Sequence, residues 1–294
     1  MRKLCSQQTI LPSIQALCLD YGYRCATRFC SKLFEMKHLT RHICLVVTVL
    51  SIKAAAQGPP IFTDTPIMLG LEGGGVRTFG NIVSKENAKA YVHILAIPYN
   101  ISNKWQVGVI APFVSKSPDG LKTNSGFGDL KIFTKHEIYK KDGKGKTFRG
   151  LLKITETFPT GNSKDLPPLG AGINQTTISL VNGYVTTKYG IYWEVGYNVT
   201  SGGLFDNVVY NIAFDYPLLP QVYPPKQLNV SLELNGNYVR DGVGNNLFIS
   251  PAIQFIAGRK VLFETGVQLP LDEVAIEGTR TNYVLRIGTR ILLF

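Results

Sequence analysis

From about residue 66 onward, apolar and polar residues alternate with a period of two, which is the pattern of a strand with one apolar face. Ile191, Trp193 and Val195 share one face, for example, while Tyr192 and Glu194 share the other. Most of these segments exceed the five or six residues typical of soluble strands, and they match the roughly nine to eleven that a tilted membrane strand needs. The predicted strands are 66–80, 88–100, 104–114, 127–140, 146–158, 173–187, 190–200, 206–216, 226–238, 246–257, 260–270 and 281–294.

The connections between these segments fall into two groups. Tight turns are predicted at 102–103, 142–143, 189–190 and 258–259, and longer polar loops at 115–126, 159–172, 201–205, 239–245 and 271–280. Short turns on one side and long loops on the other are typical of outer-membrane barrels, although the proline-rich stretch 217–225 breaks this regularity. Because backbone groups in lipid must pair internally, we expect an all-β fold, a transmembrane antiparallel β-barrel of about twelve strands of the Gram-negative outer-membrane type. A secreted β-sandwich is the alternative, since its strands also alternate.

The segment from Met36 to Gln57 has the features of a secretory signal peptide. A basic start is followed by an apolar run, Ile43–Ile52, and by the small residues Ala54–Ala56 before a predicted mature N-terminus at Gln57. Residues 1–35 are interpreted as an upstream start artefact or an unstructured extension, with an organellar transit peptide as the alternative. Residues 57–65 are then a periplasmic segment that hangs free or enters the lumen as a short plug, and 66–294 form the barrel.

Composition agrees with export. All five cysteines precede the predicted cleavage point, so the mature chain has no thiolate for a disulfide or a metal. The formal charge of the whole chain is +11, but the basic residues are scattered apart from a cluster at 140–146. This distribution does not indicate nucleic-acid binding.

Several short motifs resemble the outer-membrane family named for the MetA pathway of phenol degradation. They are Gly58–Pro66 after the signal peptide, Gly128–Ile132 at a strand start, and Phe158–Asn162 followed by Leu169–Gly172. The resemblance implies a barrel that helps small, often aromatic compounds to cross the outer membrane. It implies no catalytic residues.

The strand faces that are not apolar carry charges of both signs, and we predict that these side chains line the pore. The candidate pore-lining residues are Asp129, Lys131, Lys135, Glu137, Lys153, Glu194, Asp215, Glu233, Glu264, Arg286 and Arg290. Of these, Lys131, Lys153, Glu194, Glu233, Arg286 and Arg290 are the predicted solute contacts. Such charges select solutes in some pores, while in a narrow barrel they only form ion pairs with one another. Phe133, Tyr192 and Phe248 share the same faces and either stack against apolar solutes or fill space.

An outer-membrane lipid hydrolase is a competing hypothesis. The mature chain has two histidines, His93 and His136, and neither accompanies a Gly-x-Ser-x-Gly element. His136 shares the apolar face of its segment, where a membrane hydrolase centre would lie. The spacing of residues supports neither a metal site nor a cofactor site.

The sequence thus predicts a passive transporter or channel for small solutes, without enzymatic activity. Its expected partners are membrane lipid, a small-molecule solute and the outer-membrane insertion machinery, but not nucleic acid. Loops 115–126 and 159–172 are expected to form the outer mouth. The alternatives are a non-conducting structural or adhesive barrel and the hydrolase, and the sequence leaves the oligomeric state open.

Overall fold

The computed structural model describes residues 58–68, 70, 72–202, 206–220, 226–239, 244–275 and 278–293. The predicted signal peptide, the N-terminal extension, Gln57 and Phe294 therefore lie outside the described residues. Within the described ranges the regular structure is entirely β-strand. A search of these ranges finds no helix of the length and apolarity needed to cross a bilayer.

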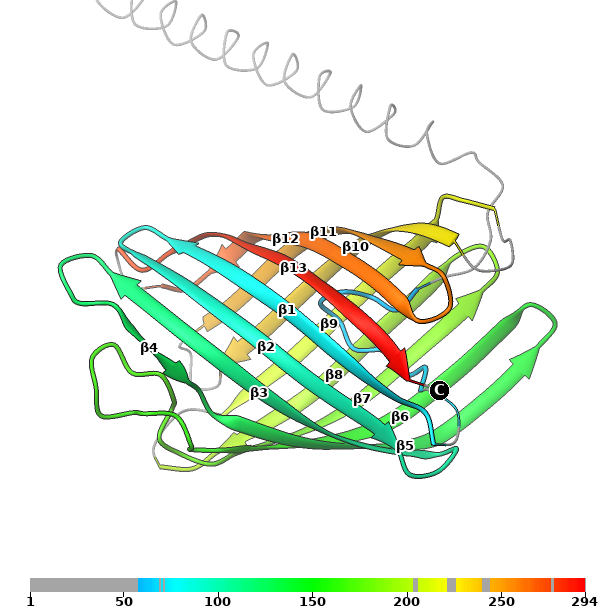
Figure 1. The fold of residues 1–294 in the computed structure, drawn as a ribbon, viewed down its shortest axis with the longest axis horizontal. Helices are drawn as coiled ribbons and strands as arrows, with labels where there is room; N and C mark the ends of the chain where they lie inside the picture. Colours follow the sequence, from blue (N-terminus) through cyan, green and yellow to red (C-terminus); the bar gives the residue numbers. More distant parts are fainter. Residues whose placement is uncertain are drawn as a thin grey trace, which may run out of the picture. The chain divides into compact units, whose positions relative to one another are not determined.

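Thirteen strands form a single antiparallel sheet (Figure 1). They are β1 (Gly74–Lys85), β2 (Ala88–Asn100), β3 (Trp105–Pro118), β4 (Asn124–Phe127), β5 (Leu130–Gly143), β6 (Lys146–Phe158), β7 (Gln175–Thr186), β8 (Gly190–Thr200), β9 (Asn207–Pro217), β10 (Lys226–Val239), β11 (Gly244–Ala257), β12 (Val261–Glu273) and β13 (Thr281–Leu293). Because β1 pairs with both β2 and β13, the sheet closes into a barrel. Strands β4 and β5 share one position in the wall, since both pair with β3. The predicted closed barrel of twelve strand positions is therefore confirmed.

Burial follows the alternation of residues along each strand. In β7, Ile178 and Leu180 are 48% and 49% exposed on the outer face, whereas Ser179 and Val181 are 2% and 0% exposed on the inner face. Large apolar side chains, exposed on the outside of a closed barrel, are what a hydrocarbon environment requires. The residues that a soluble protein would bury in its core thus form the outer surface here.

The two ends of the barrel differ in their connections. At one end, here the turn end, the links include 101–104, 144–145, 187–189 and 258–260, and β1 begins at this end. At the other, the loop end, the links include 119–123, 159–174, 201–206 and 274–280. The link between β1 and β2 at the loop end is only two residues long, so the alternation of short and long connections is not complete.

The two largest differences from the predicted boundaries lie at the first strand and at the loop 115–126. The first strand begins at Gly74 rather than at residue 66, because the chain turns just before it. Gly73 N–H donates to Gly70 O at 2.9 Å, and Glu72 has a positive φ of 59°. The loop predicted at 115–126 is shorter, because β3 continues to Pro118 and β4 pairs with its last residues.

Residues 58–68, which we call the plug, lie inside the barrel. Ile61 and Thr63 are 1% and 2% exposed, and Pro60 and Pro66 are fully buried. The plug contacts side chains from opposite parts of the wall, including β1, β5, β10 and β13.

Candidate functional site: the plugged lumen

The interior of the barrel is polar. Among the described residues, one cluster of buried apolar side chains is formed by Met68 of the plug with Leu151 and Val181 of the wall. Most other fully enclosed positions carry acids, amides or hydroxyls, such as Glu233, Asp215 and Gln254. The plug is therefore held by polar contacts more than by a hydrophobic core.

Glu233, from β10, binds the backbone of the plug from one side. Its carboxylate is fully buried and accepts the N–H groups of Ile61, Phe62 and Thr63, at 2.8 Å, 3.0 Å and 2.5 Å. Asn235, two residues further along the same strand face, donates to Thr63 Oγ1 at 3.3 Å. A buried carboxylate needs several donors to replace water, and three successive amides provide them.

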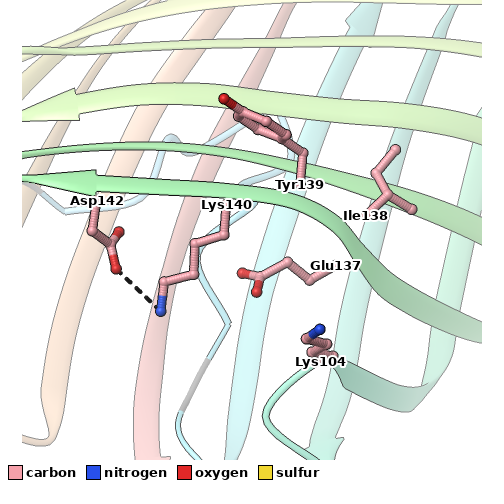
Figure 2. A pocket seen from close by; sticks show the side chains of 6 residues that line it. All are labelled: Lys104, Glu137, Ile138, Tyr139, Lys140 and Asp142. Atoms are coloured by element: carbon pink, nitrogen blue, oxygen red, sulfur yellow. Dashed lines mark ion pairs between the residues drawn. The ribbon is translucent and has the colours of Figure 1, made fainter.

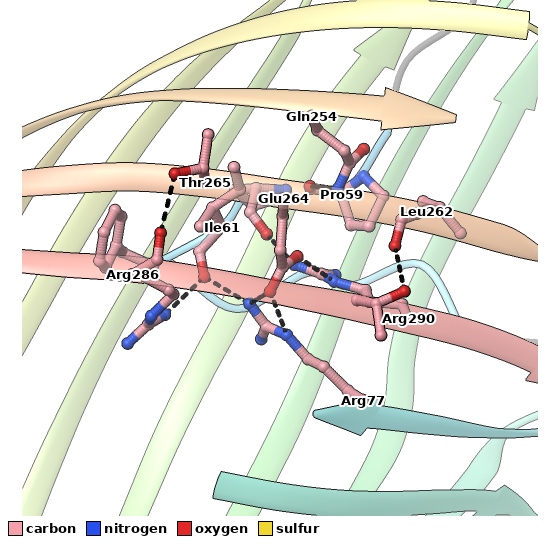
Figure 3. A network of polar contacts seen from close by, with 12 residues as sticks. Pro59, Ile61, Arg77, Gln254, Leu262, Glu264, Thr265, Arg286 and Arg290 are labelled. Carbon is pink, nitrogen blue, oxygen red and sulfur yellow. Dashed lines mark hydrogen bonds and ion pairs between the residues drawn. The ribbon is translucent and has the colours of Figure 1, made fainter. Parts of the chain in front are cut away.

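Three arginines bind backbone carbonyl oxygens of the plug (Figure 3). Arg77 and Arg286 donate to Ile61 O at 2.6 Å and 2.8 Å, and Arg290 donates to Pro60 O at 2.6 Å. The backbone of the plug is thus paired on both sides, with its N–H groups on an acid and its C=O groups on guanidinium groups.

Glu264, from β12, is the carboxylate within this arginine group. Its Oε1 accepts Arg77 Nη2 at 2.7 Å, and its Oε2 accepts Arg290 Nε at 2.6 Å. It is 3% exposed, so the two ion pairs are shielded from solvent. Arg286 hydrogen-bonds the neutral side chain of Asn81 at 2.8 Å and lies 4.3 Å from the ring of Phe62.

Asp64 is the only charged residue of the plug, and it binds two lysines of the wall. Lys135 Nζ lies 2.5 Å from its Oδ1, and Lys153 Nζ lies 2.8 Å from its Oδ2. Burial alone raises the pKa of this carboxyl, but the two ammonium groups outweigh burial and hold the pKa well below its ordinary value. Lys153 also lies 3.6 Å from Glu194, which connects the plug to β8.

The structure thus brings seven of the eleven predicted pore-lining residues into contact with the plug or with its direct partners. They are Lys135, Lys153, Glu194, Glu233, Glu264, Arg286 and Arg290. Three others occupy inner-face positions: Lys131 is on the face of Lys135, Asp215 is 2% exposed near the turn end, and Glu137 pairs with Arg149 at 3.5 Å.

Asp129, the last of the predicted pore-lining residues, binds a loop. It lies in the break between β4 and β5, where its carboxylate accepts Gly161 N–H at 2.9 Å and Ala171 N–H at 2.7 Å. Both donors belong to the connection between β6 and β7. Lys116 of β3 also binds this connection, through Pro168 O at 2.5 Å. Asp129 therefore anchors a loop at the loop end.

Two arginines of the inner face were missed from the sequence. Arg77 was overlooked because the glycine-rich start of the first segment concealed where strand alternation begins. Arg149 could have been predicted to lie on the inner face, because it shares the face of Lys153 in β6.

The two histidines lie on the outer face of the wall. His93 has both ring nitrogens engaged, with Thr78 Oγ1 at 2.8 Å and Tyr91 OH at 2.9 Å. This group borders a hollow of about 320 Å³ between β13, β1 and β2. The ring of His136 packs 4.6 Å from that of Trp105. Each histidine thus contacts a neighbouring side chain of the wall.

A second hollow, of about 370 Å³, lies at the turn end beside β5 (Figure 2). It is lined by Lys104, Glu137, Ile138, Tyr139, Lys140 and Asp142. Lys140 and Asp142, two residues apart in β5, form an ion pair at 3.2 Å, with both side chains about half exposed. The described residues contain no group of three or more His, Cys, Asp or Glu side chains arranged to hold a metal ion.

No protein-family model and no curated protein matches this chain. Solved structures do resemble it. The COG4313 outer-membrane channel from Pseudomonas putida F1 superposes with a TM-score of 0.57 at 17% identity, over 81% of this chain and 100% of that one. The KdgM and NanC porins give TM-scores of 0.48 and 0.49 at 9% and 10% identity, each over 74% of this chain and 98% of theirs.

The chain therefore has the fold of an outer-membrane channel barrel. At these identities the similarity defines the fold alone. The narrower assignment to the phenol-degradation family stays a prediction.

Proposed function

We propose that this protein is an outer-membrane channel through which small solutes pass when the plug leaves the lumen. The observation that carries the proposal is how the plug is held. Polar wall groups bind its backbone, as Glu233 and Arg286 do, and water can replace each of these contacts once the segment moves. A purely structural barrel of this size would gain more from an apolar interior than from buried charge pairs.

The inner surface also supports a role in passage. Once the plug is removed, the wall offers charged side chains of both signs, among them the predicted solute contacts Lys131, Lys153 and Glu194, next to the apolar Phe133 and Tyr192. A surface of this composition suits small solutes that combine a charged group with an apolar part. We infer that the turn end faces the periplasm, as in other barrels with short periplasmic turns.

Export belongs to the same proposal. The sequence supports a signal peptide at 36–56 and insertion of the barrel by the outer-membrane insertion machinery. Sequencing the N-terminus of protein purified from outer-membrane fractions tests this step, and the expected first residue is Gln57. A protein that retains the preceding apolar run would contradict cleavage at this site.

The channel itself is tested by locking the plug in place. Thr63 and Asn235 lie in hydrogen-bond contact, and the described chain contains no cysteine. We expect the double variant Thr63→Cys/Asn235→Cys to form a disulfide that mass spectrometry can detect. In planar bilayers the oxidised protein should stay closed, and reduction should restore opening events.

Each single-cysteine variant is the control for this experiment, and it should respond to neither oxidant nor reductant. Equal conductance of the locked and the reduced protein would show that solutes do not need the plug to move. Absence of conductance in every form, including the wild type, would favour a non-conducting structural barrel.

A further inference from the structure

The three arginines in the lumen, Arg77, Arg286 and Arg290, place more positive charge together than the stability of the wall requires. Arg77 of β1 lies directly opposite Arg290 of β13 in the strand register, and like charges in this position destabilise a sheet. One carboxylate, Glu264, serves both. The hydrogen bonds of Arg286 go to neutral acceptors, namely Asn81 Oδ1 and Ile61 O.

The plug supplies hydrogen-bond acceptors for these arginines. Two successive carbonyl groups, of Pro60 and Ile61, accept hydrogen bonds from all three guanidinium groups, at 2.6 to 2.8 Å. Carbonyl oxygens carry only partial negative charge. An anion with two oxygens would form stronger, charge-assisted bonds with the same donors, because guanidinium groups match carboxylates in a bidentate geometry.

The surface beside the arginines is apolar. The ring of Phe79 lies 4.7 Å from the guanidinium carbon of Arg77 and 4.3 Å from that of Arg286. Phe79 is 7% exposed, and Leu262, also on the inner face, is 5% exposed. A ligand seated on the arginines would therefore place an apolar group against this wall.

We propose that Arg77, Arg286 and Arg290 form a binding site for a small organic carboxylate with an apolar body, and that such a ligand competes with the carbonyl groups of the plug. The site rests on the channel function proposed above and gives that channel a substrate class. Binding at this site would also favour opening, because a ligand that binds only the unplugged state shifts the equilibrium toward that state. In the plugged state the carbonyl groups of Pro60 and Ile61 occupy the donors that would bind the ligand.

The competition can be measured with benzoate as the probe and benzamide as its neutral analogue. Full-length protein in detergent is titrated by calorimetry with each compound. In the wild type, only the unplugged fraction can bind, so the apparent affinity for benzoate is reduced by that fraction. The substitution Glu233→Gln weakens the plug and keeps the hydrogen-bonding groups of the arginines, and it should tighten benzoate binding by about tenfold or more. Asp64→Asn should act in the same direction from the other end of the plug.

Arginine variants in the Glu233→Gln background test the site itself. Arg286→Gln should weaken benzoate binding by at least about tenfold, and Arg286→Lys should weaken it less, since a charge is kept but the bidentate fork is lost. The matched control is Arg149→Gln, which removes an inner-face arginine that pairs with Glu137 and not with the plug. This control should leave benzoate binding unchanged. Faster migration of unboiled samples on gels establishes that each variant contains a folded barrel.

The outcomes separate this inference from the channel proposal. Equal binding of benzoate and benzamide, or full binding by the folded Arg286→Gln variant, would overturn the carboxylate site. If Glu233→Gln conducts ions but binds no benzoate, the site is wrong and the channel stands. If it binds benzoate but does not conduct, the site stands and the channel proposal fails.

Discussion

Glu233 should control how often the channel opens. Its carboxylate accepts three successive plug N–H groups, at 2.8, 3.0 and 2.5 Å, and it is fully buried. In the variant Glu233→Gln one oxygen acceptor is kept, while the new NH₂ group faces N–H donors that it cannot pair with. The substitution preserves the size of the side chain, so the loss concerns hydrogen bonds and charge rather than packing.

The size of the effect follows from the number of bonds. A hydrogen bond to a charged group contributes about 1.5–3 kcal/mol, and a neutral one about 0.5–1.5 kcal/mol. Replacing three charge-assisted bonds by one or two neutral ones should therefore destabilise the plugged state by at least about 1.5 kcal/mol. At 1.4 kcal/mol per factor of ten, the ratio of open to closed states rises by about tenfold or more.

Planar-bilayer recordings of the full-length protein measure this ratio directly as the fraction of time spent open. The matched control is Glu137→Gln, because Glu137 is a buried inner-face carboxylate that pairs with Arg149 and does not contact the plug. It should leave the open fraction near that of the wild type. An open fraction in Glu233→Gln that equals the wild-type value, in protein shown to be folded, would refute the reasoning that these three bonds hold the plug.

Three further predictions follow from the same geometry. Neutralising Arg286 and Arg290 together should shift the ion selectivity of the open channel toward cations, as measured by reversal potentials in a salt gradient, and unchanged selectivity would mean that they do not line the open path. Because the pKa of Asp64 is lowered, its ion pairs stabilise the plugged state fully above the ordinary carboxyl pKa of about 4. This stabilisation is lost only as the pH falls through the lowered pKa. The open fraction of Asp64→Asn relative to wild type should therefore be the same at pH 7 and pH 5, and a ratio that collapses at pH 5 would contradict it. Finally, unboiled protein from outer-membrane fractions should migrate faster on gels than boiled protein, whereas a soluble protein without this shift would contradict the membrane barrel.

Strand positions could be predicted because the environment of each residue alternates with the sequence. The segments 88–100, 146–158 and 190–200 coincide with β2, β6 and β8. Lipid on one side and a polar lumen on the other impose opposite demands on successive side chains, so the sequence alternates along the length of each strand. The prediction failed where the pattern ends, at the turn of Glu72 and Gly73 before β1.

The contacts between the plug and the wall could not be predicted from the sequence of the plug. Residues 58–68 bind the wall mainly through backbone N–H and C=O groups, which every residue has, so their side chains carry little information about the contact. The same limit applies to Asp129. Its partners are the backbone amides of Gly161 and Ala171, and only the folded loop brings these close to a carboxylate that strand alternation had placed in the lumen.

Recognition through the backbone raises the question of what fixes the register of the plug. A shift of the segment by one residue in one direction would place Pro60, which has no N–H group, opposite Glu233. A shift in the other direction would still present N–H groups to Glu233 and C=O groups to the arginines. It would, however, move Asp64 away from Lys135 and Lys153, where it forms two short ion pairs. Because Asp64 is the only charge in the plug, these two pairs distinguish the native register from its neighbours. Glu233 and the arginines therefore provide most of the binding, while Asp64 selects the register. An occupant that competes for the arginines consequently removes part of the binding, and the plug leaves its position only when Asp64 also separates from Lys135 and Lys153.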